Sequence, residues 1–240
     1  MKLEICANSF QSALNAQIAG ADRIELCTEL ALGGITPSHG LIEKVVSELD
    51  IEVYVLIRPR SGNFTYTDEE FDVMKRDIEF CKRIGCQGIV SGILMKDNSI
   101  DIKRTEQLLK LSSPLDFTFH RAFDLIPNAV EGLQQLMDIG VPRILSSGQQ
   151  PSAEQGLPLL KKLLQLSQSK ISIMPGAGIS ANNAHLFKEA GFREIHCSAS
   201  SVMKNDYVPK LPMSSRQAFD ESGTTVSDIE KIKKIRSSIR

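Results

Sequence analysis

The sequence lacks the features of several large classes of proteins. Its formal net charge is only −1 over 240 residues, which gives no reason to expect nucleic acid or an anionic membrane surface as a partner. No apolar run approaches the roughly 20 residues that a membrane-spanning helix needs. Met1 leads directly into the strand-like residues 2–6, which leaves no room for a signal peptide. We therefore expect a cytoplasmic protein.

Familiar metal and cofactor motifs are also missing. The five cysteines are scattered, with no CxxC pair, so neither a disulfide framework nor a zinc ribbon is indicated, and the thiols should be free. There is no HExxH or HxH motif, as a hard-metal hydrolase site would have. No GxGxxG fingerprint follows the first predicted strand, where Asn8, Ser9 and Phe10 stand instead.

What the sequence does contain is a regular alternation of strands and helices. Eight short apolar segments predict strands, each followed by a segment of helical periodicity, at intervals of roughly 27 residues. The predicted strands cover residues 3–6, 23–27, 52–57, 88–91, 116–120, 143–146, 170–174 and 194–197. Eight such units favour an α/β fold, a (β/α)8 TIM barrel with a C-terminal helical extension. An open doubly wound sheet is the main alternative.

Capping residues predict where several helices begin. Thr67 and Ser152 are each followed three residues later by a Glu or Gln, which is the pattern of a capping box. Pro127 suits the first position of a helix. Glycines that predict helix ends stand before the next strand at Gly20, Gly85, Gly140 and Gly191.

The chain divides into a predicted barrel domain, residues 1–201, and an extension, residues 202–240. The extension ends in a helix that should begin with a capping box formed by Ser227 and Glu230. One face of that helix is apolar and carries Ile229, Ile232, Ile235 and Ile239. This face must pack either on the barrel or against another subunit.

Strand parity predicts which side chains point into the barrel. Alternate strand residues face the surrounding helices and the interior, and the helix-facing set has to be apolar. Phe117 and Phe119 belong to that outer set. The opposite parity predicts that the inward residues are Glu4, Cys6, Glu25, Cys27, Arg58, His120 and His196. They lie late in their strands, at the end where barrel enzymes hold their active sites.

The loops that follow the strands contain groups that suit an anion. Two arginines follow the third strand and one follows the fifth, and guanidinium groups bind carboxylate or phosphate well. The loops after strands six, seven and eight are small, polar and partly glycine-rich, and barrels often hold phosphate at the last two. The candidate anion-binding residues are Arg58, Arg60, Arg121, Ser147, Gly176, Gly178 and His196.

One hypothesis is an enzyme that acts on a small phosphorylated or carboxylated metabolite. His120 would serve as a general acid or base, and Glu25 or Asp124 would orient its imidazole or complete a proton relay. Lyase, isomerase and hydrolase reactions all stay open. The plainer alternative is that the inward charges neutralise one another inside the barrel.

A second hypothesis is a soft-metal site. Cys6 and Cys27 occupy corresponding positions at the ends of neighbouring strands, with the same inward parity. Two thiols that approach each other, with His196 on the adjacent strand, would suit Cu(I) better than magnesium or calcium. The alternative is that both thiols only fill space, since free cysteine is often buried.

The sequence resembles the CutC family, whose name comes from copper homeostasis. The similarity runs from Met1 to about Ser201, in the stretches LEICANSFQSALNAQIAGADRIELC, LALGGITPSHGLI, VLIRPRSGNFTYTDEEFDVM, DFTFHRAFD, ILSSGQ and EIHCSAS. The resemblance implies a (β/α)8 barrel, a cytoplasmic location and a homo-oligomer, a dimer or tetramer. It also implies copper ion binding and a role in copper homeostasis.

Overall fold

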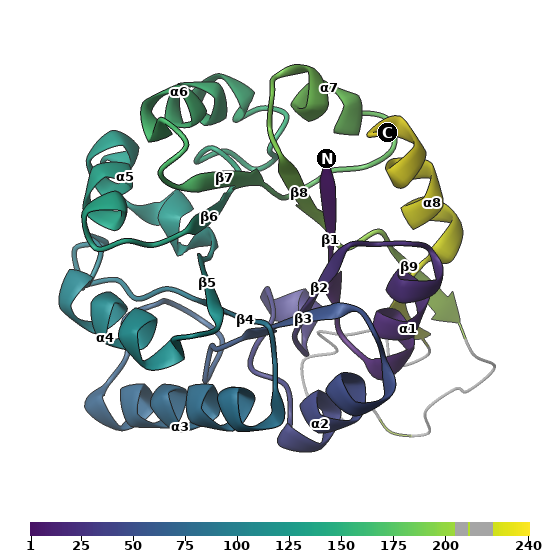
Figure 1. Ribbon diagram of the computed structural model, residues 1–240, viewed down its shortest axis with the longest axis horizontal. Coiled ribbons are helices and arrows are strands. Elements are labelled where there is room, and N and C mark those ends of the chain that lie inside the picture. Colours follow the sequence, from purple (N-terminus) through teal and green to yellow (C-terminus); the bar gives the residue numbers. More distant parts are fainter. Residues whose placement is uncertain (205–210, 212–222) are drawn as a thin grey trace.

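Eight parallel strands form one curled sheet at the centre of the molecule (Figure 1). The computed structural model describes residues 1–204, 211 and 223–240. The strands are β1 (Lys2–Ala7), β2 (Arg23–Leu26), β3 (Glu52–Leu56), β4 (Gly88–Ser91), β5 (Asp116–Phe119), β6 (Arg143–Ser146), β7 (Ser172–Pro175) and β8 (Glu194–Cys197). Their hydrogen-bonded order is β7-β6-β5-β4-β3-β2-β1-β8. A parallel bridge between Gly176 and His196 joins the two ends, so the predicted (β/α)8 barrel is confirmed.

Helices surround the strands in Figure 1. They are α1 (Phe10–Ile18), α2 (His39–Glu48), α3 (Asp68–Ile84), α4 (Ile102–Ser112), α5 (Ala129–Asp138), α6 (Leu157–Ser167), α7 (Ala184–Glu189) and α8 (Ile229–Ser238). Two short 3-10 helices, η1 (Leu30–Leu32) and η2 (Arg121–Leu125), follow β2 and β5. Within the described ranges, no helix is long and apolar enough to cross a membrane.

The terminal helix α8 packs on its own barrel, between α1 and α7 (Figure 1). Ile232, Ile235 and Ile239 are almost completely buried there, as the apolar spacing predicted. An antiparallel hairpin of β9 (Ser200–Lys204) and β10 (Gly223–Ser227) connects β8 to this helix. Because α8 is the helix that follows β8, it takes the place of the eighth helix in the outer ring.

Two of the predicted helix starts differ from the observed ones. Asn128, not Pro127, precedes α5, because its side chain accepts hydrogen bonds from two backbone N–H groups, those of Val130 and Glu131. The Ser152 hydroxyl accepts from the Gln155 N–H, but in a turn that ends before α6 begins at Leu157. A capping pattern alone does not show whether the first turn continues into a helix.

The predicted start and end of α3 are confirmed, whereas α8 starts one residue later than predicted. The capping box between Thr67 and Glu70 is confirmed at the start of α3, and Gly85 ends that helix with a φ of 86°. At α8 the cap is Asp228, which accepts from the Lys231 N–H. Ser227 belongs instead to β10, where its N–H donates to the Ser12 hydroxyl. Pairing in the hairpin therefore shifted this helix start by one residue.

The parity of the strands is as predicted. Phe117 and Phe119 are buried between the sheet and the helices, as are Leu3 and Ile5. Burial of one such side chain contributes about 1.5–3 kcal/mol. Since successive strand residues face opposite sides, the residues between these apolar ones project into the barrel, and they are the polar residues of the site described next.

Candidate functional site

A cavity of about 260 Å³ lies at the carboxyl ends of the strands. It is far larger than the roughly 10–15 Å³ that a single water molecule occupies. Two groups of side chains line it. The acidic wall consists of Cys6, Glu25 and His196, from β1, β2 and β8, and the basic wall consists of Arg58, His120 and Arg121, which follow β3 and β5.

On the acidic wall, His196 is oriented by a buried carboxylate. Its Nδ1 lies 2.7 Å from Glu4 Oε1 and 3.8 Å from Glu25 Oε2. Burial would lower the pKa of His196, but the hydrogen bond to Glu4 and the charge of Glu25 outweigh it and raise that pKa. Burial alone would raise the pKa of Glu4, whereas Arg23 and His196 lower it to about 2. Glu4 is therefore the fixed anion that holds the imidazole.

Glu25 differs from Glu4 in that no arginine forms an ion pair with it among the described residues, where its one ion-pair partner is His196, 3.8 Å away. Its Oε2 is buried and makes no hydrogen bond within the described chain. Burial raises the pKa of Glu25 to about 7, against the opposing charge of His196. One ligand atom each from Glu4, Glu25 and His196 lies within 4.8 Å of the others, so these residues could also surround a cation. Glu4, however, is already bound by Arg23 and His196.

Cys6 and Cys27 meet as the parity predicted. Their sulfur atoms are 3.5 Å apart and both residues are buried. The hydrogen bond with Cys27, followed by burial, raises the pKa of the Cys6 thiol well above its ordinary value. The Cys6 side chain is therefore a thiol at neutral pH, and a metal that bound it would have to displace a proton.

On the basic wall, Arg58 is buried without a carboxylate. Its Nη1 donates to the carbonyl oxygens of Leu32 and Gly34, at 2.9 and 2.8 Å, and its Nη2 donates to that of Gly62. Arg58 forms no ion pair with the acidic residues that the structure describes, and its buried Nε has no hydrogen-bond partner there. The three bonds fix the guanidinium and leave its charge uncompensated.

His120 is fixed as a neutral donor. Its Nδ1 accepts from the backbone N–H of Ala122 at 3.2 Å, so the ring proton must be on Nε2. That Nε2 is buried and has no partner among the described residues. Burial, together with the charge of Arg58, lowers the pKa of His120 to about 3. Neither Glu25 nor Asp124 bonds this ring, so the expected orientation of His120 by a carboxylate is not observed.

Asp124 organises the loop after β6. Its carboxylate accepts from the backbone N–H and the hydroxyl of Ser147, from the Ser146 hydroxyl and from the Gln149 N–H. Arg121 donates to the same carboxylate from Nε and to the Ser147 hydroxyl from Nη2. Asp124 and Ser147 thus hold Arg121 at the edge of the cavity and do not line it themselves.

Of the remaining residues that the sequence predicted for the site, only Gly178 lines the cavity, whereas Gly176 and Arg60 do not. Gly178 lines the cavity, with a φ of 71°. Gly176 packs behind it, and a Cβ there would come within 2.5 Å of Leu145. Arg60 points away: its Nε lies 2.5 Å from Glu70, and its other nitrogens bind loop oxygens. Arg60 therefore does not join Arg58 in the cavity.

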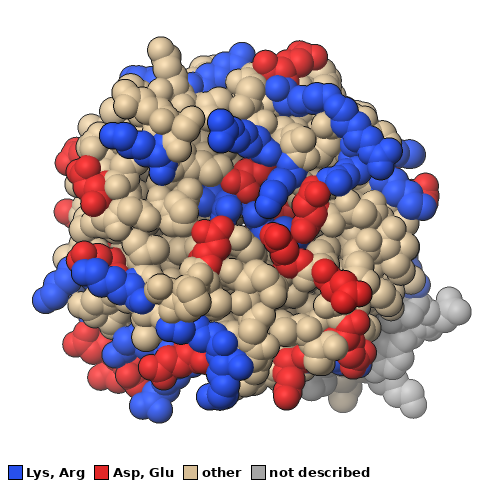
Figure 2. All heavy atoms as spheres, viewed as in Figure 1, with Lys and Arg blue, Asp and Glu red and all other residues tan. Residues whose placement is uncertain are grey.

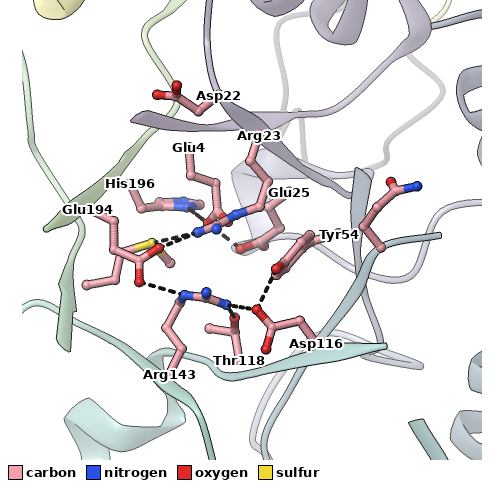
Figure 3. A network of polar contacts seen from close by, with 12 residues as sticks. Glu4, Asp22, Arg23, Glu25, Tyr54, Asp116, Thr118, Arg143, Glu194 and His196 are labelled. Carbon is pink, nitrogen blue, oxygen red and sulfur yellow. Dashed lines mark hydrogen bonds and ion pairs between the residues drawn. The ribbon is translucent and has the colours of Figure 1, made fainter. Parts of the chain in front are cut away.

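Beneath the cavity lies a set of charged residues of which the sequence analysis predicted only Glu4. Acidic and basic side chains lie intermixed near the middle of the face that Figure 2 shows, and Figure 3 shows the contacts inside the barrel. The ionic network comprises Glu4, Arg23, Asp116, Arg143 and Glu194. Glu194 bridges Arg23 and Arg143, at 2.8 Å from each. The parity rule, applied to the first residue of strands two, six and eight, would have found three of these residues.

The fold and the cavity define a (β/α)8-barrel protein with a cavity at the carboxyl ends of its strands that charged side chains line. The family model described as the CutC family matches residues 1–201. The chain belongs to the CutC family.

Similar proteins come from bacteria and from man. A family protein CutC of Photorhabdus laumondii is 50% identical over 202 residues, which cover 84% of this chain and 81% of that protein. The copper homeostasis protein cutC homolog of Homo sapiens is 39% identical and covers 98% of this chain and 88% of its own length. A crystal structure of the putative copper homeostasis protein CutC from Streptococcus agalactiae matches with a TM-score of 0.78 and 35% identity, over 82% of this chain and 98% of that one.

A more distant match shows the fold alone. Thiamine phosphate pyrophosphorylase from Pyrococcus furiosus is 14% identical, with a TM-score of 0.61, and covers 99% of this chain and 95% of that one. A shared barrel does not transfer an activity, because barrels carry many unrelated reactions.

Proposed function

We propose that this protein binds Cu(I) through Cys6 and Cys27 and acts in copper homeostasis. The observation that carries the proposal is the 3.5 Å separation of the two sulfur atoms, at a cavity wall. Thiolates are soft ligands that select Cu(I) over hard cations. The names of the human and streptococcal relatives give independent support.

Copper binding at this pair should depend on pH. The raised pKa of Cys6 means that Cu(I) must displace a proton from a thiol, so affinity should rise as pH rises. The neighbouring carboxylate of Glu25 opposes thiolate formation at Cys6. Proton release on copper addition, measured in weakly buffered solution, would report this exchange directly.

A competition experiment tests the copper site. The reduced protein is titrated against a Cu(I) chelator, and the Cys6→Ser, Cys27→Ser double variant should lose affinity by about 100-fold or more, because both soft ligands are removed. The matched control is Cys81→Ser, Cys86→Ser, which changes another buried pair of free thiols, in and after α3. Undiminished affinity in the first variant, or an equal loss in the control, would exclude the Cys6 and Cys27 site.

Location and assembly belong to the same proposal. We place the protein in the cytoplasm, where thiols stay reduced and can bind Cu(I), and expect a homo-oligomer, a dimer or tetramer. Cell fractionation and light scattering of the purified protein measure these two properties. A secreted protein, or a monomer at all concentrations, would contradict them.

Acid–base catalysis on a small metabolite is a second candidate function. The observation that favours it is that Glu4 orients His196 while Glu25 Oε2 stands 3.8 Å away without a hydrogen bond in the described chain. A carboxyl with a pKa of about 7 suits proton transfer at neutral pH. His196 and Glu25, rather than His120, would then exchange protons with the substrate, as in a lyase, isomerase or hydrolase.

A metabolite screen tests this second function. A ligand at one hundred times its dissociation constant should stabilise the protein by about 2.7 kcal/mol in a thermal-shift assay. Each hit is then incubated in D2O and followed by NMR. Deuterium should enter the hit with wild-type protein and not with Glu25→Gln, although the variant still binds it. Equal exchange in both proteins would remove Glu25 from the reaction.

A further inference from the structure

The basic wall contains two buried donors that no described residue uses. Arg58 and His120 are each only 5% exposed, yet Arg58 Nε and His120 Nε2 have no hydrogen-bond partner. Buried polar groups are nearly always bonded in folded proteins. Two exceptions in one cavity wall indicate that a ligand supplies the missing acceptors.

The charge of the wall points to the sign of that ligand. The other arginines buried in the barrel, Arg23 and Arg143, pair with carboxylates. The described neighbours of the Arg58 guanidinium are instead neutral: carbonyl oxygens, the ring of Phe64 and the hydroxyl of Tyr66. A buried charge is costly unless an opposite charge compensates it. Glu25 belongs to the same cavity, but it forms no ion pair with Arg58 among the described contacts.

Arg121 adds a second positive charge at the open side of the wall. Its side chain is 46% exposed, and Asp124 and Ser147 hold it in place through Nε and Nη2. His120 directly precedes Arg121 in the sequence. Its ring packs against Phe64, with ring centroids 4.7 Å apart. The wall therefore combines two guanidinium groups with one neutral N–H donor.

We propose that Arg58, His120 and Arg121 bind the carboxylate or phosphate group of a small metabolite in this cavity. Such oxyanions accept several hydrogen bonds at once and are well matched to guanidinium groups. The cavity of about 260 Å³ leaves room for the rest of a small molecule toward the acidic wall. Anion binding here does not depend on copper at Cys6 and Cys27. If the second candidate function is correct, the bound anion is its substrate, and in that one respect the inference rests on the proposed function.

The strain in the loop after β7 is consistent with a ligand at this place. Ala177 lines the cavity with a φ of 90°, which a residue with a Cβ rarely adopts. Strained backbone of this kind is concentrated at binding sites and active sites. Gly178 continues the bend with a φ of 71°.

Binding of inorganic phosphate and of acetate tests the proposal. Each anion is titrated into the metal-free, reduced protein, with chloride keeping the ionic strength constant, and binding is followed by NMR of the anion and by isothermal calorimetry. At least one of the two should bind saturably. Tighter phosphate binding identifies a phosphorylated ligand, and tighter acetate binding a carboxylated one. Failure of both anions to bind saturably would overturn the proposal.

Variants separate this site from its surroundings. His120→Phe keeps a ring against Phe64 and removes the donor, so it should weaken anion binding by about tenfold, the effect of one hydrogen bond to a charged group. Arg121→Met should weaken it as well. Arg60→Met is the matched control and should bind like wild type, because Arg60 lies outside the cavity. Equal affinity in all three variants, with each fold verified by circular dichroism, would overturn the proposal.

The same titration keeps the other functions apart. The Cys6→Ser, Cys27→Ser variant should bind the anion like wild type. If the thiol variant loses copper and keeps the anion, the two sites are independent. If it loses both to the same degree, the basic wall is not a separate site.

Discussion

Two sets of charged residues occupy the barrel interior, and they differ in how completely they are paired. In the ionic network each carboxylate contacts at least one guanidinium. Arg23 Nη1 has no hydrogen-bond partner among the described residues, but the guanidinium of Arg23 lies 4.4 Å from the centroid of the Tyr54 ring. In the cavity above it, Glu25, Arg58 and His120 each leave a buried atom without a partner. The charges of the first arrangement are paired with one another, whereas the second leaves polar atoms available to the ligand that we propose.

The sequence left two alternatives for the inward charges: they neutralise one another, or they form a binding or active site. A self-neutralising set of ion pairs does exist, but it is formed by residues near the starts of the strands, such as Arg23, Arg143 and Glu194. Among the cavity residues, His196 pairs with Glu4 and Arg121 with Asp124, whereas Arg58 pairs with no described carboxylate. Both sets are buried, so they differ instead in how many of their charged groups have a partner of opposite charge among the described residues.

The largest effect is expected when the ionic network loses its bridge. Glu194→Gln should lower the free energy of unfolding by about 3–5 kcal/mol, because it removes the carboxylate that two buried guanidinium groups share and leaves Arg23 with Glu4 alone and Arg143 with Asp116 alone. Urea denaturation at pH 7 measures the loss. Glu194→Asp is the control that keeps the charge. If the free energy of unfolding falls by less than in an ordinary surface substitution, the ionic network does not stabilise the end of the barrel where the strands start.

A smaller effect of opposite sign is expected at Glu25. Its pKa in the folded protein is about 7, against an ordinary value of 4.5, so the stability present below pH 4.5 is lost as pH rises through 7. Glu25→Gln removes this penalty and should raise the free energy of unfolding at pH 8 by about 3 kcal/mol. At pH 4 the two proteins should be nearly equal. A destabilised variant at pH 8 would mean that Glu25 is paired after all.

His120 should make the protein sensitive to acid. Its pKa falls from an ordinary value of 6.5 to about 3 on folding, so the stability present above pH 6.5 is lost as pH falls toward 3. Between pH 7 and pH 5 this loss is about 2 kcal/mol. The His120→Phe variant should lack that share of the pH dependence, which denaturation at the two pH values measures. An unchanged slope would indicate that the imidazole titrates normally.

The smallest effect is expected at Arg60. Its pair with Glu70 is partly exposed on both sides, and such pairs contribute less than about 1 kcal/mol. Arg60→Met should therefore change the denaturation midpoint only slightly. A loss as large as that of Glu194→Gln would contradict the contrast between a buried network and a pair near the surface.

The parity argument predicted the site best where it concerned strand residues. Cys6 and Cys27 meet, and Glu25 and His196 share a cavity wall, because alternation along a strand is a local property of the backbone. The argument missed Arg23 and Glu194, since the predicted site was sought only near the strand ends. Their position at inward parity was readable from the sequence.

Loop residues were less predictable. Arg58 and Arg60 are two residues apart and were expected to act together, yet Arg58 enters the cavity and Arg60 binds Glu70, at the start of α3. Asp124 was expected near His120, but the amides and hydroxyls of the loop after β6 bind its carboxylate. In both cases a partner that is distant in sequence decided the direction of the side chain.

The sequence by itself determined the barrel, its strand order and the inward set of residues, because hydrophobic periodicity and the alternation of strand side chains are fixed by neighbours in the chain. Only the tertiary structure decided which of these charges neutralise one another and which remain unused. Pairing depends on distances of a few ångströms between residues from different strands and loops, and no local pattern encodes such distances. The division between the ionic network and the open cavity is thus a property of the closed barrel.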